Sequence, residues 1–249
     1  MSTLAGRRVV VTGAGGGGLG KNIALTCAKA GAELIISDIA EEGLQETLKA
    51  VEAIGGKVEA KVMDLGDPES IAAFGKSIEG PLHGLVNNGA IATGIGGIGF
   101  EEIPIESWDK VMTVNVRGTW LLIRALAPQL RASGSGRIVN LASDTALWGA
   151  PNLMSYISSK GAVMAMTRGL ARELGPDRVG VAAIAPGILT TPSTEYVPEA
   201  RHTLYETQRA VPGPQGTEEV ADVAAYLLTE AAITLTGQTL PVDHGFVFN

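Results

Sequence analysis

The chain has 249 residues, of which 45% are hydrophobic, and a formal net charge of −7. It is long enough to bury one large core, and its acidic balance, without a run of Lys and Arg, argues against a nucleic-acid partner. The single cysteine, Cys27, excludes an intrachain disulfide; with no signal-peptide pattern at the start and no apolar run suited to a membrane span, we expect a cytoplasmic protein.

Short β-branched runs alternate with longer amphipathic segments. The runs predict strands at residues 7–13, 32–38, 57–64, 82–89, 136–143, 179–187 and 237–245. The amphipathic segments predict helices at residues 19–31, 41–56, 67–78, 106–131, 153–174 and 216–229. This alternation predicts an α/β single-domain Rossmann fold over residues 1–249: a doubly wound, parallel, seven-stranded sheet with helices on both faces.

One connection is longer than the others. Residues 188–213, between the sixth strand and the next helix, are polar, interrupted by prolines and helical in the middle. Insertions of this length often serve a function, so we expect a substrate lid.

Six glycines lie between positions 13 and 20, where the first strand gives way to a helix. Backbone N–H groups at such a place can bind a pyrophosphate. The G-x-G-x-x-G pattern fits both as Gly13-Gly15-Gly18 and as Gly15-Gly17-Gly20, and a flexible surface turn is the alternative interpretation.

Asp38 ends the second strand, eighteen residues after Gly20. A carboxylate there can accept hydrogen bonds from the adenosine ribose and would repel a 2′-phosphate. Because no Arg or Lys lies beside it in sequence, Asp38 favours NAD over NADP. Its alternative role is a helix N-cap at the strand exit.

Tyr156 and Lys160 are spaced i and i+4, on one face of a predicted helix. An ammonium near a phenol lowers the phenol pKa from its ordinary value of about 10 and favours acid/base chemistry. Ser143 ends the fifth strand, where ligands of parallel α/β sheets bind, and its hydroxyl could polarise a carbonyl. Each of these residues also has a purely structural interpretation. Tyr156 and Lys160 could be an ordinary helix pair, and Ser143 an N-cap or turn hydroxyl. Asn115 could be a buried amide whose hydrogen bonds are satisfied.

Together these motifs resemble the short-chain dehydrogenases/reductases, of the NAD-dependent alcohol dehydrogenase or ketoreductase type. The matching pieces, in chain order, are TGAGGGGLG, Asp38, MDL, NNGA, NVRG, Ser143, YISSK, APGILTT and TGQTLPVDHG. Their order and spacing cover nearly the whole chain.

The resemblance implies a role for each matching residue. Tyr156 would be the general acid/base, Lys160 would lower its pKa and bind the nicotinamide ribose, and Ser143 would hold the substrate oxygen. Asn115 would position a water of the proton relay. The implied cofactor-binding residues are Gly13, Gly15, Gly18, Leu19, Gly20, Asp38, Ile39, Asp64, Leu65, Asn87, Tyr156, Lys160, Pro186, Gly187, Leu189 and Thr191.

Three departures from the family pattern stand out. Four residues instead of three separate Gly13 from Gly18, NNGA replaces Asn-Asn-Ala-Gly, and His244 stands where the family usually has glycine. None of these departures changes Ser143, Tyr156 or Lys160.

Substrate and partners are less directly encoded. Trp148 and Tyr196 would join Ser143 and Tyr156 in binding the substrate, although Trp148 could equally fill the core. These neighbours favour an uncharged secondary alcohol or ketone, and no metal is expected. The alternatives are an NADPH-dependent 3-oxoacyl-carrier-protein-type reductase and a non-catalytic NAD-sensing protein. The resemblance also implies a homotetramer, with the helix at 153–174 in an interface.

Overall fold

The computed structural model describes residues 3–191, 194 and 197–248. These residues contain a seven-stranded sheet in the order β3-β2-β1-β4-β5-β6-β7, in which every neighbouring pair is parallel. The strand order reverses between β1 and β4, and this reversal produces a doubly wound sheet. The predicted fold is therefore confirmed. The strands are β1 (Arg8–Thr12), β2 (Glu33–Asp38), β3 (Lys57–Val62), β4 (Gly84–Asn87), β5 (Arg137–Leu141), β6 (Gly180–Pro186) and β7 (Thr239–Val242).

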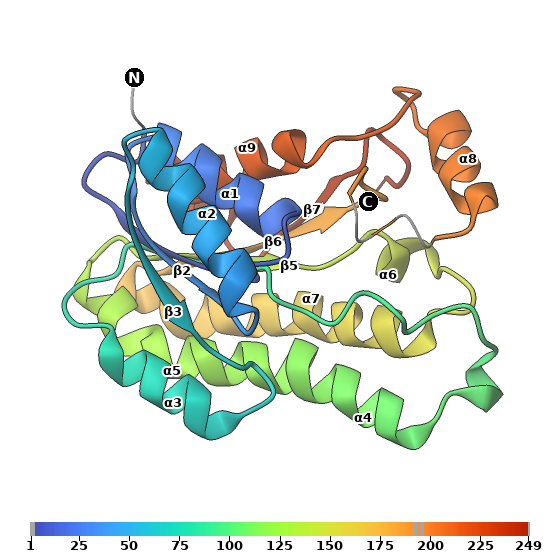
Figure 1. Ribbon diagram of the computed structural model, residues 1–249, viewed down its shortest axis with the longest axis horizontal. Helices are drawn as coiled ribbons and strands as arrows, with labels where there is room; N and C mark the ends of the chain where they lie inside the picture. The colour runs from blue at the N-terminus through green and yellow to red at the C-terminus, as the bar shows by residue number, and fades with distance from the viewer. Residues whose placement is uncertain (1–2, 192–193, 195–196, 249) are drawn as a thin grey trace.

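Helices cover both faces of the sheet (Figure 1). One face carries α1 (Leu19–Lys29), α2 (Glu41–Ala53) and α9 (Thr217–Leu227). The other carries α3 (Pro68–Ser77), α4 (Ile105–Met112), α5 (Thr119–Ala132) and α7 (Met154–Leu174). The described residues include no helix that is both long and apolar enough to cross a membrane.

The central strands, unlike the edge strand β3, are apolar on both sides because both sides are covered. Val9 and Val11 of β1 point into the core beneath α1 and α9, whereas Val10 points into the core formed with α3 and α5. In β2, Leu34 points into the first of these cores and Ile35 into the second. This two-sided burial explains why the strands read as continuous apolar runs.

The predicted helix at 106–131 contains an irregular turn. Between α4 and α5 the chain forms a π-helical turn, η2 (Thr113–Gly118). The helix expected in the middle of segment 188–213 is α8 (Glu199–Gln208), whereas the short α6 (Thr145–Trp148), directly after β5, was not predicted. Figure 1 shows both at the same end of the molecule. Short 3₁₀ segments among the described residues are η1 (Phe100–Glu102), η3 (Gly175–Asp177) and η5 (Ala231–Leu235).

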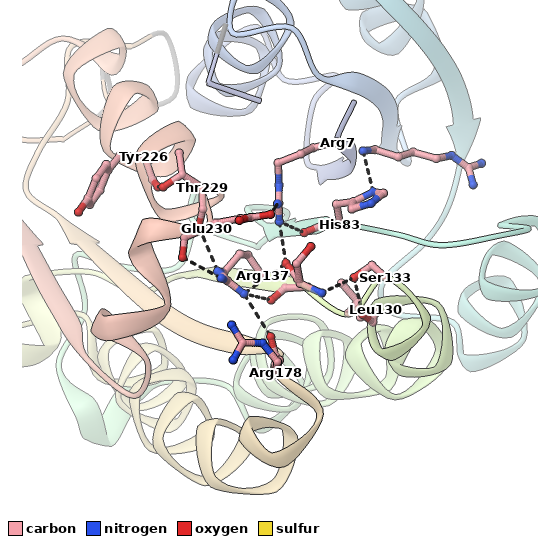
Figure 2. Close-up of polar contacts among 12 residues, drawn as sticks. Arg7, His83, Leu130, Ser133, Arg137, Arg178, Tyr226, Thr229 and Glu230 are labelled. Carbon is pink, nitrogen blue, oxygen red and sulfur yellow. Dashed lines mark hydrogen bonds and ion pairs between the residues drawn. The ribbon is translucent and has the colours of Figure 1, made fainter. Parts of the chain in front are cut away.

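Two buried arginines hold the amino ends of the strands (Figure 2). Arg137, which begins β5 and is 3% exposed, donates hydrogen bonds to the carbonyl oxygens of Ser135, Gly136, Arg178, Thr229 and Glu230. Arg7 donates to the carbonyl oxygens of His83 and Ser135. Burial lowers the pKa of both guanidinium groups. These bonds join strand starts to the end of α9, at the end of the sheet opposite Ser143.

Candidate active site

The glycine-rich loop joins β1 to α1. Gly13 has a φ of +68°, a left-handed conformation that favours glycine. A Cβ atom on Gly20 would lie 2.1 Å from the carbonyl oxygen of Gly13, so only glycine lets α1 begin this close to the loop. Gly16 and Gly17 meet no described atom within 4 Å of an added Cβ. The packing therefore requires glycine at Gly13, Gly15 and Gly20, where an added Cβ would lie less than 3.0 Å from backbone atoms. The first N–H groups of α1 face the region where a phosphate could bind.

Asp38 lies beside this loop at the end of β2. Its Oδ2 accepts a hydrogen bond from the Gly15 N–H at 2.7 Å, and its Oδ1 accepts one from the Ala40 N–H at 2.9 Å. The N-cap of α2 is Ala40 rather than Asp38. The carboxylate thus ties β2 to the glycine loop, and it also lines the cleft described below.

Ser143, Tyr156 and Lys160 line one cleft at the carboxyl end of β5. The Ser143 hydroxyl oxygen accepts hydrogen bonds from Thr145, from Oγ1 at 2.8 Å and from the backbone N–H at 3.3 Å. Tyr156 and Lys160 lie on α7, and the Lys160 ammonium is 5.5 Å from the centroid of the Tyr156 ring. The predicted catalytic side chains are therefore brought together.

Lys160 is almost completely enclosed. Its side chain is 5% exposed, and Nζ donates a hydrogen bond to the carbonyl oxygen of Leu141 at 2.7 Å. Burial lowers the pKa of Lys160 to about 8. At pH 7 the ammonium form still predominates, so a cation remains beside the Tyr156 ring.

Asn115 lies in the π-helical turn and is buried. Its Oδ1 accepts from the Ile91 N–H at 2.8 Å, and its Nδ2 donates to the Ile91 carbonyl oxygen and to Ser159 Oγ. Ser159 Oγ in turn donates to the carbonyl oxygen of Tyr156 at 2.7 Å. The side chain of Asn115 therefore holds the first turn of α7 in place, and it does not line the cleft.

The cleft has a volume of about 1320 Å³. It runs from the glycine loop, past the ends of the central strands, to segment 188–213, and it is large enough for a dinucleotide and a second small molecule. The predicted site residues that line it are Gly13, Gly18, Leu19, Gly20, Asp38, Ile39, Asp64, Leu65, Ser143, Tyr156, Lys160, Pro186, Gly187, Leu189 and Thr191.

The structure places three other predicted residues elsewhere. Gly15 does not line the cleft, and its N–H donates to Asp38 Oδ2. The side chain of Asn87 points into the interior, where its Nδ2 donates to Asn140 Oδ1, and the neighbouring Asn88 lines the cleft instead. Trp148 packs edge-on against Tyr205 and Phe246 and lines a small cavity that adjoins the cleft, not the cleft itself. Tyr196 lies outside the described residues.

Two of the family departures have visible consequences. A Cβ atom on Gly89 would lie 2.9 Å from Leu65 Cδ1, so the exchanged NNGA order puts its glycine where the cleft wall is tight. His244 adopts a φ of 60°, and its Nε2 lies 2.9 Å from Glu219 Oε1. His244 is therefore in the left-handed backbone region that the family's glycine would enter without strain.

The sequence analysis did not identify a buried row of hydrogen-bonded side chains beside Ser143. Trp148 Nε1 donates to the Tyr205 hydroxyl at 3.1 Å, and that hydroxyl donates to Asp144 Oδ1 at 2.8 Å. Burial, and to a smaller extent the nearby Asp243, raise the pKa of Asp144 to about 7, although the bond from Tyr205 acts in the opposite direction. Asp144 follows Ser143 directly, whereas Tyr205 comes from α8, so only the folded chain shows that they meet.

Known proteins resemble the chain over almost its full length. A family model described as Enoyl-(Acyl carrier protein) reductase matches residues 13–247. The 3-oxoacyl-acyl-carrier-protein reductase of Thermotoga maritima is 34% identical, over 98% of this chain and 99% of that protein. Cyclohexanol dehydrogenase of an Acinetobacter species is 32% identical, over 95% of this chain and 93% of that protein.

A solved structure agrees with the sequence relatives. A protein from Beutenbergia cavernae, assigned as an NAD(P)-dependent gluconate 5-dehydrogenase and holding NADP at low occupancy, superimposes with a TM-score of 0.91. It is 35% identical, and the match covers 98% of both chains. On this evidence the chain belongs to the short-chain dehydrogenase/reductase family of oxidoreductases, which bind a nicotinamide cofactor.

Proposed function

We propose that this protein transfers a hydride between NAD(H) and a secondary alcohol or ketone, with Tyr156 as the general acid/base. The observation that carries the proposal is the Lys160 ammonium 5.5 Å from the Tyr156 ring centroid, in the cleft that Ser143 also lines. A dinucleotide would be held by the glycine loop, whose close packing leaves its backbone accessible, and by Asp38 and the residues after β6. The nicotinamide ring would supply the hydride chemistry.

Each catalytic side chain has a separate task. In alcohol oxidation the Tyr156 phenolate takes the proton from the alcohol, and in ketone reduction the Tyr156 phenol gives its proton to the ketone oxygen. The Lys160 cation stabilises the phenolate that forms when the proton leaves. The Ser143 hydroxyl donates to the same substrate oxygen, which gains negative charge during the reaction. Asn115 is a positioning residue through Ser159 and the Tyr156 carbonyl oxygen, and its part in a water relay stays a prediction.

Substitution of Tyr156 by Phe tests this assignment. Losing the group that exchanges the proton with the substrate should lower kcat by about 10²- to 10⁴-fold, while the Kd for NADH changes little because the ring remains. NADH formation with a panel of secondary alcohols, for wild type and Tyr156→Phe, measures both. Equal rates for the two proteins would exclude Tyr156 as the acid/base. Cofactor binding without any turnover by the wild type would favour a sensing protein.

We further propose that NAD is preferred to NADP. Asp38 presents a carboxylate at the adenosine end, and the described cations that line the cleft, Lys110, Lys160 and Arg201, come from elements other than β2 and the glycine loop. A 2′-phosphate beside Asp38 would therefore be repelled without compensation.

Cofactor titration separates this preference from the NADPH-linked alternative. NADH should bind wild type at least about tenfold more tightly than NADPH, a difference of about 1.4 kcal/mol. Ile39 lines the cleft next to Asp38 and is 64% exposed, so Ile39→Arg should reduce the preference by adding a phosphate partner. The matched control is Ile54→Arg, which is also exposed but outside the cleft. Tighter NADPH binding by wild type would favour a 3-oxoacyl-carrier-protein-type reductase.

A homotetramer is also part of the proposal. Exposed apolar side chains lie on two sides of the chain: Ile105, Trp120 and Met154 on α4, α5 and α7, and Tyr226 and Phe248 near the C-terminus. Two such surfaces would support two kinds of subunit contact. Sedimentation analysis should give four times the mass of the chain, and a monomer would contradict the proposal.

A further inference from the structure

Arg201 of α8 lines the same cleft as Ser143 and Tyr156. Its Nη2 donates a hydrogen bond to the carbonyl oxygen of Pro151 at 3.2 Å, and Pro151 also lines the cleft. Arg201 therefore reaches from segment 188–213 to the loop before α7, and both of these segments line the cleft.

The guanidinium group has no carboxylate of the described residues within 4 Å. Arg131, in contrast, lies 2.6 Å from a carboxylate oxygen of Asp177. The neighbour of Arg201 is an aromatic ring instead: its guanidinium carbon is 5.7 Å from the centroid of Trp148. An arginine has five N–H donors in a planar fork, and the bond to Pro151 uses one of them.

The other charged groups in this part of the cleft are already engaged. Lys160 is buried and donates to the Leu141 carbonyl oxygen, and Asp144 is buried and accepts from the Tyr205 hydroxyl. Lys110 belongs to α4, which lies on the opposite side of the sheet from α8 (Figure 1). Among the described residues, Arg201 is thus the partly exposed cation that a substrate beside α8 could contact.

A small apolar cavity adjoins Arg201. It has a volume of about 270 Å³ and shares Pro151, Pro198 and Arg201 with the main cleft. Trp148, Ala200 and Leu204 form the rest of its lining. A substrate that extends from the catalytic residues toward α8 would therefore meet apolar walls and a cation together.

We propose that Arg201 binds an acidic group of the substrate: a carboxylate or similar oxyanion that is separated by an apolar part from the carbon that reacts. The planar fork of arginine matches an oxyanion with two parallel hydrogen bonds, and the Trp148 ring holds the cation in place. This inference rests on the proposed function, and it replaces the expectation of an uncharged substrate. Arg201 would be a specificity-determining residue and not part of the hydride and proton chemistry.

A binding experiment tests Arg201 without requiring turnover. The probes are benzoate, phenylacetate and 3-phenylpropionate, each paired with its primary amide, titrated calorimetrically into the full-length protein with NADH present. At least one carboxylate should bind wild type about tenfold more tightly than its amide. Arg201→Met should remove this difference, and Arg201→Lys should keep part of it.

The chain offers a matched control. Arg124 of α5 also lies 5.7 Å from a tryptophan centroid, that of Trp120, and does not line the cleft. Arg124→Met should therefore behave like wild type. The proposal fails if wild type binds acids and amides alike, if no carboxylate binds, or if Arg201→Met keeps the preference.

Kinetics then separate this inference from the proposed function. For alcohols turned over both as carboxylate and as amide, Arg201→Met should raise KM for the carboxylate about tenfold and leave kcat within about twofold. The values for the amide should stay unchanged. Loss of turnover in Tyr156→Phe concerns the proposed reaction alone, whereas loss of the acid-over-amide preference in Arg201→Met concerns Arg201 alone.

Discussion

Two ionisable residues of the cleft, Lys160 and Asp144, have pKa values shifted toward neutrality by the same cause. Burial disfavours a charge, so it lowers the pKa of Lys160 to about 8 and raises that of Asp144 to about 7. Lys160 lies beside Tyr156, where a cation would stabilise the phenolate. Asp144 has no such partner cation within 4 Å among the described residues, and its Oδ2 is buried without a hydrogen bond. Ionisation of Asp144 should therefore cost stability.

The sign and pH range of this cost follow from linkage. The ordinary pKa of an aspartate is 3.8, and that of folded Asp144 is about 7. The folded state keeps a proton that the unfolded state releases, so the free energy of unfolding falls as pH rises between these values, by up to about 4 kcal/mol. Asp144→Asn removes the charge but still accepts the Tyr205 hydrogen bond. Its stability relative to wild type should therefore rise from pH 5 to pH 7 and level off above.

Urea unfolding of both proteins at pH 5, 6, 7 and 8 measures this difference. Asp109→Asn, at an exposed position of α4, is the control for the Asp-to-Asn exchange itself. A difference between wild type and Asp144→Asn that does not vary with pH would contradict the raised pKa.

At the scale of elements, the glycine loop fits between β1, α1 and α2 by direct backbone contact. A Cβ atom on Gly43 of α2 would lie 1.9 Å from the Gly15 carbonyl oxygen, as close as the contact between Gly20 and Gly13 on the other side. Helices can approach a loop this closely only where side chains are absent. The positions of both helices therefore depend on single glycines.

A pair of alanine substitutions tests this fit. Gly20→Ala would force backbone atoms apart and should destabilise the protein by about 2 kcal/mol or more. Gly16→Ala meets open space and should leave the melting temperature nearly unchanged. Thermal unfolding of the two variants is measured without cofactor. Any effect of the added methyl group on cofactor binding then does not change the melting temperature. Equal melting temperatures would show that the loop can move aside.

The order of elements could be predicted because apolar periodicity and capping residues are local signals. Asp67 is an example: its side chain accepts from the Glu69 N–H, with Pro68 at the first position of α3. The cleft wall was harder to predict, because Asn87 and Asn88 are identical neighbours at the end of β4 and successive side chains point to opposite sides. Arg201 and Tyr205 could not be assigned, since nothing in segment 188–213 indicates which strand end it covers.

At the scale of the whole molecule, the two ends of the sheet have different tasks. The carboxyl ends of the strands carry the candidate active site, and the amino ends are joined by Arg7 and Arg137 (Figure 2). Arg137 begins β5, and Ser143 follows the other end of the same strand. Substitutions at the amino end should therefore affect folding and leave ligand binding unchanged.

Arg137→Met tests this separation. It would leave several buried carbonyl oxygens without their donor and should lower the free energy of unfolding by about 2–4 kcal/mol. Glu230→Gln should cost less than about 1 kcal/mol, because the Glu230 side chain is 78% exposed where it faces Arg7. Denaturant unfolding gives both values, and titration of the folded variants with NADH should give the wild-type Kd. A weakened Kd in Arg137→Met would show that the two ends are coupled.

The two hydrogen bonds that Asp38 accepts limit how the preference for NAD or NADP can be redesigned. The carboxylate that would select the dinucleotide also holds the Gly15 and Ala40 N–H groups. Exchanging it for a neutral residue would release the turn that, in the proposed function, holds the phosphates, so selectivity and affinity would decline together. An engineer who wants an NADPH-dependent enzyme should keep this aspartate and build outward from Ile39.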